Sequence, residues 1–153
     1  MKRRTLLKGS FAGSILGVAA SAGLLTPRMV LAAWPASAFT AKKSDEALTA
    51  LHGSNSTSES GDITIKAPDI AENGAVVPIT VTTSMKADSI TLLVKENPSP
   101  LACTYALGDT TEGYVSTRIK MGKTSDVIAV VKSGGKLHSA TKVVKVTIGG
   151  CGG

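Results

Sequence analysis

The sequence predicts an all-β domain, an antiparallel β-sandwich of about seven strands, preceded by a short helix. After residue 61 the chain alternates between runs rich in Val, Ile and Thr and turn segments such as Asn73-Gly74 and Ser133-Gly134-Gly135. Strands this short and evenly spaced pair with their neighbours and bury one face against a second sheet. Because aromatic residues make up only 3% of the chain, the core is expected to consist of Val, Ile, Leu and Ala.

The elements are expected in the following order. A helix over 41–51 has Ser44 as its N-cap and carries Asp45 and Glu46 in its first turn, where negative charge favours the helix dipole. Segment 53–61 is polar and shows no periodicity, so it is predicted to be a linker. The strands are then expected at 63–68, 76–83, 89–94, 102–107, 114–121, 127–131 and 137–148.

The first 33 residues have the pattern of an export signal. Arg3 and Arg4 precede an apolar run over 11–25 that glycines interrupt and that is too short to span a bilayer. Small residues at 31–33 and at 36–38 mark expected cleavage sites. The paired arginines are typical of the twin-arginine route, which leads to the periplasm. An uncleaved membrane anchor is the alternative.

These signals divide the chain into four parts: a signal peptide over 1–33 with cleavage as late as 38, a helix and linker over 34–61, a sandwich domain over 62–148 and an arm over 149–153. The leader contains five of the 17 Lys and Arg residues and none of the 11 acidic ones. The remaining part is therefore nearly neutral. This excludes the concentrated basic face that a nucleic-acid-binding protein needs.

The C-terminal arm is the feature that predicts chemistry. The last strand ends in Gly149-Gly150-Cys151-Gly152-Gly153, where only the cysteine carries a side chain. Glycine allows wide backbone freedom at a high entropy cost of ordering, so we expect a mobile arm. Extended, it places the Cys151 sulfur about 10 Å beyond the strand. A thiolate there can attack an electrophilic sulfur and hold a substrate through an S–S bond. No cation near Cys151 in the sequence is expected to lower its pKa, so activation is assigned to partner enzymes.

Two other readings of Cys151 stay open. It can form a structural disulfide with Cys103, although Cys103 is expected on the core face of its strand with Tyr105 and Leu107. Alternatively, the chain is a non-catalytic envelope binding module whose terminal cysteine serves only for disulfide-linked dimerisation. No Ser-His-Asp or Cys-His arrangement is assembled by spacing, which argues against an enzyme with its own catalytic site.

Two other groups of residues have side chains that could carry chemistry. His52 and His138 suggest a copper site, but such a site needs a rigid thiolate that a glycine arm does not supply. Arg118, Lys120 and Lys123 lie near one another and either receive anionic sulfur species or form an ordinary solvated strand face. We favour the second interpretation. No metal or cofactor is predicted for this chain.

The GGCGG ending and the twin-arginine leader resemble those of SoxY, the sulfur-carrier subunit of the bacterial thiosulfate-oxidising Sox system. Three internal stretches resemble the family as well: ITIKAPDIAENGAVVPIT at 63–80, VKENPSPL at 94–101 and STRIKMGKTS at 116–125. The similarity covers essentially the whole chain after the leader. Cys103 is a departure from the family pattern.

The resemblance implies an immunoglobulin-like sandwich that pairs with a second sandwich protein, SoxZ. It implies that Cys151 receives thiosulfate oxidatively through the haem-containing SoxAX. The manganese-dependent SoxB then releases sulfate, and a SoxCD sulfane dehydrogenase, in systems that have it, oxidises the remaining sulfur. The haem, manganese and molybdenum cofactors belong to these partners. This chain is then a periplasmic carrier and not an enzyme.

Overall fold

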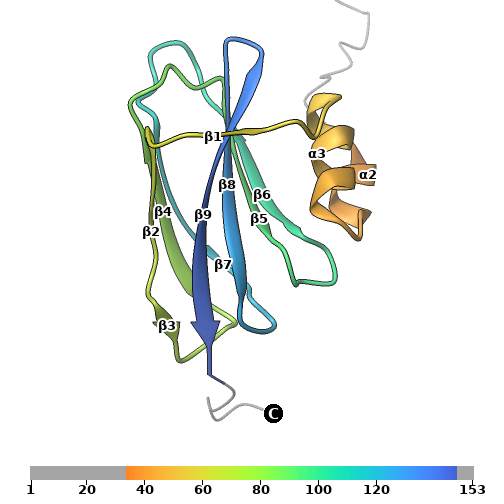
Figure 1. Ribbon diagram of the computed structural model, residues 1–153, viewed down its shortest axis with the longest axis vertical. Coiled ribbons are helices and arrows are strands. Elements are labelled where there is room, and N and C mark those ends of the chain that lie inside the picture. The colour runs from red at the N-terminus through yellow and green to blue at the C-terminus, as the bar shows by residue number, and fades with distance from the viewer. Residues whose placement is uncertain (1–33, 148–153) are drawn as a thin grey trace, which may run out of the picture. The chain divides into compact units, whose positions relative to one another are not determined.

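The computed structural model describes residues 34–147, which form two β-sheets packed face to face with two short helices on the larger sheet (Figure 1). The larger sheet has the strand order β1-β9-β8-β5-β6, and β3 also pairs with β9; the smaller sheet has the order β2-β4-β7. The strands are β1 Ser58–Glu59, β2 Ile63–Lys66, β3 Ile70–Ala71, β4 Val77–Thr83, β5 Ser89–Val94, β6 Leu101–Ala106, β7 Tyr114–Ile119, β8 Ser125–Ser133 and β9 Lys136–Val146.

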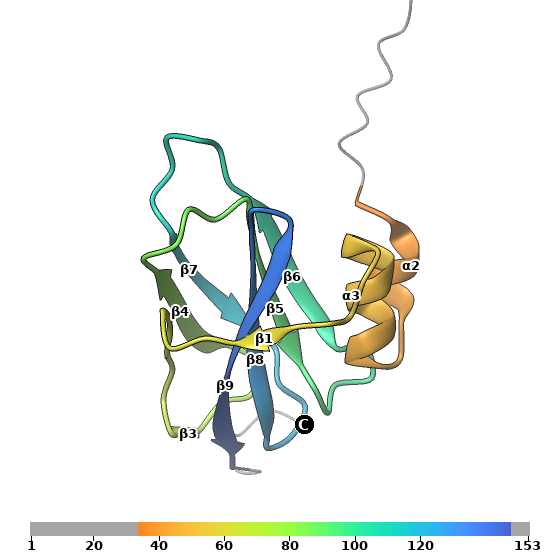
Figure 2. The same cartoon turned by 45° about the horizontal axis from the view of Figure 1, so that its top comes forward.

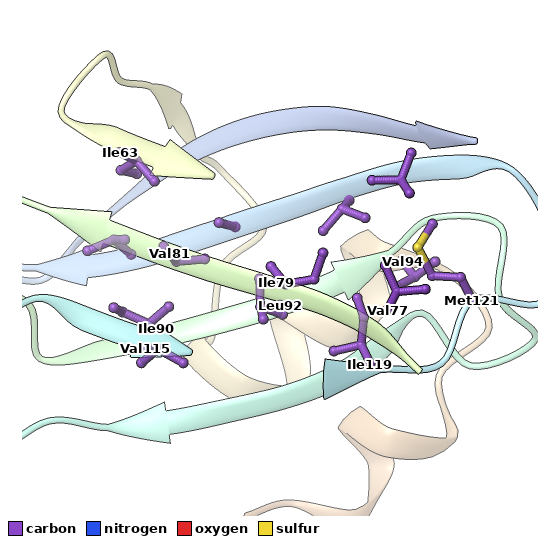
Figure 3. Close-up of a cluster of buried hydrophobic side chains, with 14 of the residues drawn as sticks. Ile63, Val77, Ile79, Val81, Ile90, Leu92, Val94, Val115, Ile119 and Met121 are labelled. Atoms are coloured by element: carbon purple, nitrogen blue, oxygen red, sulfur yellow. The ribbon is translucent and has the colours of Figure 1, made fainter. Parts of the chain in front are cut away.

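The main core lies between the two sheets, as the alternation of apolar and polar residues predicts. In β4, Val77, Ile79 and Val81 are buried, while Pro78 and Thr82 on the opposite face are exposed. The buried side chains meet those of β5 and β7 (Figure 3). Burying a Val or Ile side chain stabilises the fold by about 1.5–3 kcal/mol, so this layer supplies most of the driving force for folding.

Strand β5 is buried at all six positions because its two faces contact different layers. Ile90, Leu92 and Val94 point into the core between the sheets. Leu93 points the other way, into a second apolar cluster beneath the helices. The near-continuous apolar run 89–94 is typical of a strand covered on both sides.

Helices α2 (Ala36–Thr40) and α3 (Ser44–His52) cover the outer face of the larger sheet. Ala38, Ala47 and Leu48 are buried there against apolar residues of β5, β6, β8 and β9. Gly53 ends α3 in the left-handed conformation (φ 76°), which glycine adopts without a steric penalty. The helices are therefore part of the packed domain. No helix among the described residues is long and apolar enough to cross a bilayer.

The prediction of a β-sandwich with an N-terminal helix is confirmed, with three corrections. Ser44 is the first residue of α3 and not its N-cap, which is Lys43. The helix α2 was not expected. The segment read as a linker contains β1, and β1 and β3 pair parallel to β9, so nine strands form in residues 34–147 where seven antiparallel ones were predicted. Two-residue strands carry no periodicity in the sequence, because only their partner strand defines them.

Candidate functional site

The residues predicted to carry the chemistry lie outside the described part of the chain. These are Cys151 with the arm glycines Gly149, Gly150, Gly152 and Gly153, and the export-signal residues Arg3 and Arg4. What the structure describes is the base of the arm, the end of β9 at Val146 and Thr147. The position from which the arm starts is therefore defined.

The end of β9 is hydrogen-bonded on both of its edges. Toward β3, the backbone N–H of Lys145 donates to the Asp69 carbonyl (3.0 Å) and that of Thr147 to the Ala71 carbonyl (3.1 Å). Toward the other edge, the Val146 N–H donates to the side-chain hydroxyl of Thr124 (3.0 Å). Figure 2 shows β3 beside this end of β9, as does Figure 1. Backbone groups paired on both sides hold the strand end in a fixed position.

The turn before β4 packs directly against the arm base. Gly74 accepts a hydrogen bond from the Met121 N–H through its carbonyl (2.7 Å). A Cβ atom on Gly74 would overlap the Met121 carbonyl oxygen and lie 2.9 Å from Cγ1 of Val146. The sequence predicted a turn at Asn73-Gly74, and the Asn73 side chain accepts from the Ala75 N–H (2.9 Å) as such turns require. The close approach is what excludes a side chain at Gly74.

Asn97 joins the loop after β5 to the loop between β7 and β8. Its Nδ2 donates to the Lys120 carbonyl (2.8 Å), and its Oδ1 accepts from the Gly122 N–H (3.0 Å). The loop that Asn97 holds contains Met121, which bonds Gly74, and leads to Thr124, which bonds Val146. Asn97 therefore acts on the arm base indirectly: it holds the loop whose residue Thr124 bonds to Val146.

We predict that Asn97→Ala lowers the free energy of unfolding by about 0.5–1.5 kcal/mol, because it removes the two hydrogen bonds that tie the two loops together at exposed backbone groups. Asn97→Asp should destabilise as well, since it keeps the acceptor for Gly122 but places a carboxylate oxygen against the Lys120 carbonyl. Urea unfolding followed by circular dichroism measures both. A loss of stability below about 0.5 kcal/mol, typical of surface substitutions, would show that the two bonds do not stabilise the fold.

Charged residues around the arm base mostly form surface ion pairs. Lys123 lies 3.1 Å from Glu96, and Lys142 lies 3.1 Å from Asp69. Such pairs contribute about 0–1 kcal/mol each. Arg118 is exposed on the outer face of the smaller sheet, opposite Pro78, and Lys120 follows β7. Lys123 is therefore engaged by Glu96, and the exposure of Arg118 is what an ordinary solvated strand face predicts.

Cys103 occupies a position that makes it a poor nucleophile. It lies on β6 beside Leu92 of β5 and packs half-buried against the core, as does Leu107. Burial raises the pKa of the Cys103 thiol, and the nearby Tyr105 side chain offsets this only in part. Tyr105 was expected on the core face but is 36% exposed, since its hydroxyl reaches across to donate to Thr117 Oγ1 of β7 (3.0 Å). At neutral pH the Cys103 thiol stays protonated.

The two histidines lie in different surroundings. His52 Nε2 is 3.3 Å from the hydroxyl of Thr91, and His138 is on β9 beside β1. Within residues 34–147, no three His, Cys, Asp or Glu side chains come together in a way that could hold a metal ion.

The three internal stretches that resemble a carrier family meet at the arm base. Stretch 63–80 contributes β3 and Gly74, stretch 94–101 contributes Asn97, and stretch 116–125 contributes Met121 and Thr124. Sequence reasoning did not identify Gly74, Asn97 or Thr124 as supports of the arm. The Asn73-Gly74 turn signal marked one of the loops, but its contact with the end of β9 depends on the fold.

Comparisons with known proteins identify the family of the chain. The model of the family "Sulfur oxidation protein SoxY" matches residues 48–151. The structure of the sulfur carrier protein SoxY from Chlorobium limicola f thiosulfatophilum is similar at 45% identity, with a TM-score of 0.62, covering 68% of this chain and 96% of that one.

A more distant structure shares the fold alone. The superoxide reductase (neelaredoxin) from Ignicoccus hospitalis has 17% identity and a TM-score of 0.51, covering 56% of this chain and 80% of that one. No curated protein matches the chain. The family match spans most of the chain and includes the position of the arm cysteine. The chain is a member of the SoxY family of sulfur carriers in sulfur oxidation.

Proposed function

We propose that this chain holds sulfur intermediates of thiosulfate oxidation covalently on Cys151 and presents them to partner enzymes. A sulfur carrier needs an accessible thiol, and the sequence contains two cysteines. The observation that supports Cys151 is the position of the other one: Cys103 is half-buried against the core, where its pKa is raised. The family match, moreover, extends to residue 151.

The proposed loading step is an oxidation. The Cys151 thiol loses its proton, its sulfur forms an S–S bond with the outer sulfur of thiosulfate, and two electrons pass to a haem-containing partner. The product is a cysteine S-thiosulfonate. Hydrolysis by a second partner then adds water across the bond to the sulfonate group, which releases sulfate and two protons and leaves one extra sulfur on the cysteine. The chain itself supplies the attachment atom and the docking surface.

The geometry of the arm base supports this role. From Thr147, the last described residue, four residues lead to Cys151, which allows a reach of up to about 14 Å. The start of the arm is fixed by β3, Thr124 and Gly74. The glycines Gly149, Gly150, Gly152 and Gly153 add no side chains that would hinder entry into a partner's active site.

The proposed partners and location follow from the family. We propose a heterodimer with SoxZ, loading by SoxAX, hydrolysis by the manganese-dependent SoxB and, where present, oxidation of the remaining sulfur by SoxCD. Arg3 and Arg4 of the leader would direct export to the periplasm by the twin-arginine route. The proposed parts of the chain are the leader 1–33, the helical segment 34–61, the sandwich 62–148 and the arm 149–153.

Intact-mass spectrometry of the protein purified from cells that oxidise thiosulfate tests the proposal. We expect populations heavier by one S2O3 unit and by one sulfur atom, both removed by a reducing agent and both located on the C-terminal peptide by digestion. Cys103 should stay unmodified under the same conditions. If the thiol of Cys151 were always bare, or found only in a disulfide between two copies, the chain would instead be a binding module that dimerises through its tail.

A further inference from the structure

A polar cavity lies at the end of the sandwich opposite the arm base. It has a volume of about 340 Å³ and is bounded by the end of α3, the segment that leads to β1, and the hairpin between β8 and β9. Figure 2 shows this segment running from α3 to β1 across β9. The polar side chains that line the cavity are His52, Ser54, Ser56, Ser58, Lys132 and Lys136. A volume of this size is within the range of small-molecule sites.

Every second residue of the segment after α3 is a serine that lines the cavity. Ser54, Ser56 and Ser58 all line it, at the two-residue spacing that places side chains on one face of an extended chain. Thr57, between them, points elsewhere and accepts a hydrogen bond from the Ser139 hydroxyl of β9 (3.3 Å). This bond, together with β1, fixes the serine face toward the cavity.

The cavity carries positive charge without a neighbouring counter-charge. Lys132 is the last but one residue of β8, and Lys136 begins β9. The ion pairs within residues 34–147 engage Lys86, Lys95, Lys123 and Lys142, but neither of these two lysines.

The nearest acidic residues along the chain do not line the cavity either. Glu59 follows Ser58, and Asp88 approaches Lys132 through its backbone, where its N–H donates to the Lys132 carbonyl (2.7 Å). The acidic side chains of α3, Asp45 and Glu46, lie in its first turn, at the far end of the helix from His52.

We propose that this cavity binds a small inorganic oxyanion of the sulfate type. Its polar side chains are two ammonium groups, three hydroxyls and an imidazole, all of which can donate hydrogen bonds, and no carboxylate lines it. A tetrahedral dianion presents acceptors in several directions and is attracted by the two uncompensated lysines. The backbone of Gly135 also lines the cavity, where no Cβ obstructs a ligand.

The inference does not rest on the proposed function of the arm. Strand β9 runs eleven residues from Lys136 to Val146, which separates the cavity from the arm base by about 33 Å. The arm reaches at most about 14 Å from Thr147. Cargo held on Cys151 of the same chain therefore cannot reach the cavity, and the proposed occupant is a free anion.

His52 reports on the charge in the cavity. Burial, and then the charge of Lys132, lowers its pKa. Its Nε2 lies 3.3 Å from the hydroxyl of Thr91, which in turn lies 2.9 Å from that of Thr104, so the side chains linked to it inside the fold are neutral hydroxyls. A bound dianion favours the imidazolium form and raises the pKa of His52. By linkage, anion affinity must then increase as the pH falls through that pKa.

The test is an NMR titration of His52 with sodium sulfate, with sodium chloride at matched ionic strength as the reference and His138→Gln to assign the two histidines. Sulfate should give a saturable shift and raise the pKa of His52, whereas chloride should not saturate. Lys132→Gln should weaken sulfate binding at least tenfold and raise the pKa of His52 in the sulfate-free protein. The same charge change at exposed Lys43, Lys43→Gln, should do neither.

Three outcomes would overturn the inference. The first is an identical response to sulfate and chloride, which means ionic screening alone. The second is sulfate binding that Lys132→Gln leaves unchanged, which places the ion elsewhere. The third is a saturable response to acetate with none to sulfate, which indicates a site for a carboxylate of a partner protein. Thiosulfate in place of sulfate should bind at the same site, because it presents the same sulfonate oxygens.

Discussion

Replacing Cys151 with serine should reduce sulfate formation from thiosulfate to the background of a mixture without carrier. Serine is nearly the same size, but its hydroxyl cannot form the S–S bond that holds the cargo, so every later step loses its substrate. The measurement is sulfate release by the partner enzymes reconstituted with the wild-type or variant chain. The thermal unfolding of the variant should match that of the wild type, because residue 151 follows the last strand of the sandwich.

Cys103→Ser is the matched control for this prediction. It removes the other thiol of the chain and should keep sulfate formation close to the wild-type rate. It should cost some stability, because Cys103 packs half-buried against the core and a hydroxyl is poorly solvated there. If Cys103→Ser abolished sulfate formation and Cys151→Ser did not, the cargo would be carried inside the sandwich and the proposed function would be wrong.

The sheets could be predicted because their signals are local. Alternation in β4, with Val77, Ile79 and Val81 inward, and the apolar run 89–94 each require only a few neighbouring residues. The docking of α3 on the larger sheet could not be predicted, because Leu48 and Leu93 are 45 positions apart and only the fold brings them together. The apolar run that forms β5 did indicate that something covers the outer face of the sheet, since a strand without a polar face is buried on both sides.

In the candidate site, too, local features could be predicted and contacts between distant segments could not. The arm is predicted from the sequence alone, because only one residue among the last five carries a side chain, and it lies outside the described residues. The supports of the arm could not, because Thr124 and Gly74 contact Val146 only once β3, β8 and β9 are in place. Cys103 lies between these cases. Its strand was predicted, but the depth of its burial depends on the packing of β5 against β6.

Gly74→Ala should destabilise the protein by about 1–3 kcal/mol, the usual cost of overpacking a well-filled site. The added Cβ would overlap the carbonyl oxygen of Met121 and press on Val146 at 2.9 Å. One contact is with the arm base and the other is with the loop after β7, so the end of β9 or this loop must move to admit the added Cβ. Urea unfolding measures the loss of stability, and the rate of cargo loading by the partner enzymes measures the displacement of the arm. We expect both to fall.

Two glycines of the same chain separate these effects. A Cβ on Gly61 would meet nothing within 4 Å, so Gly61→Ala should change stability by no more than about 0.5 kcal/mol. A Cβ on Gly113 would lie 2.5 Å from the Thr83 carbonyl oxygen, at the opposite end of β7. Gly113→Ala should therefore lose stability as Gly74→Ala does while loading at the wild-type rate below its unfolding temperature. Equal loading by the two variants would show that the position of the arm base does not matter, because a long enough glycine arm corrects for its displacement.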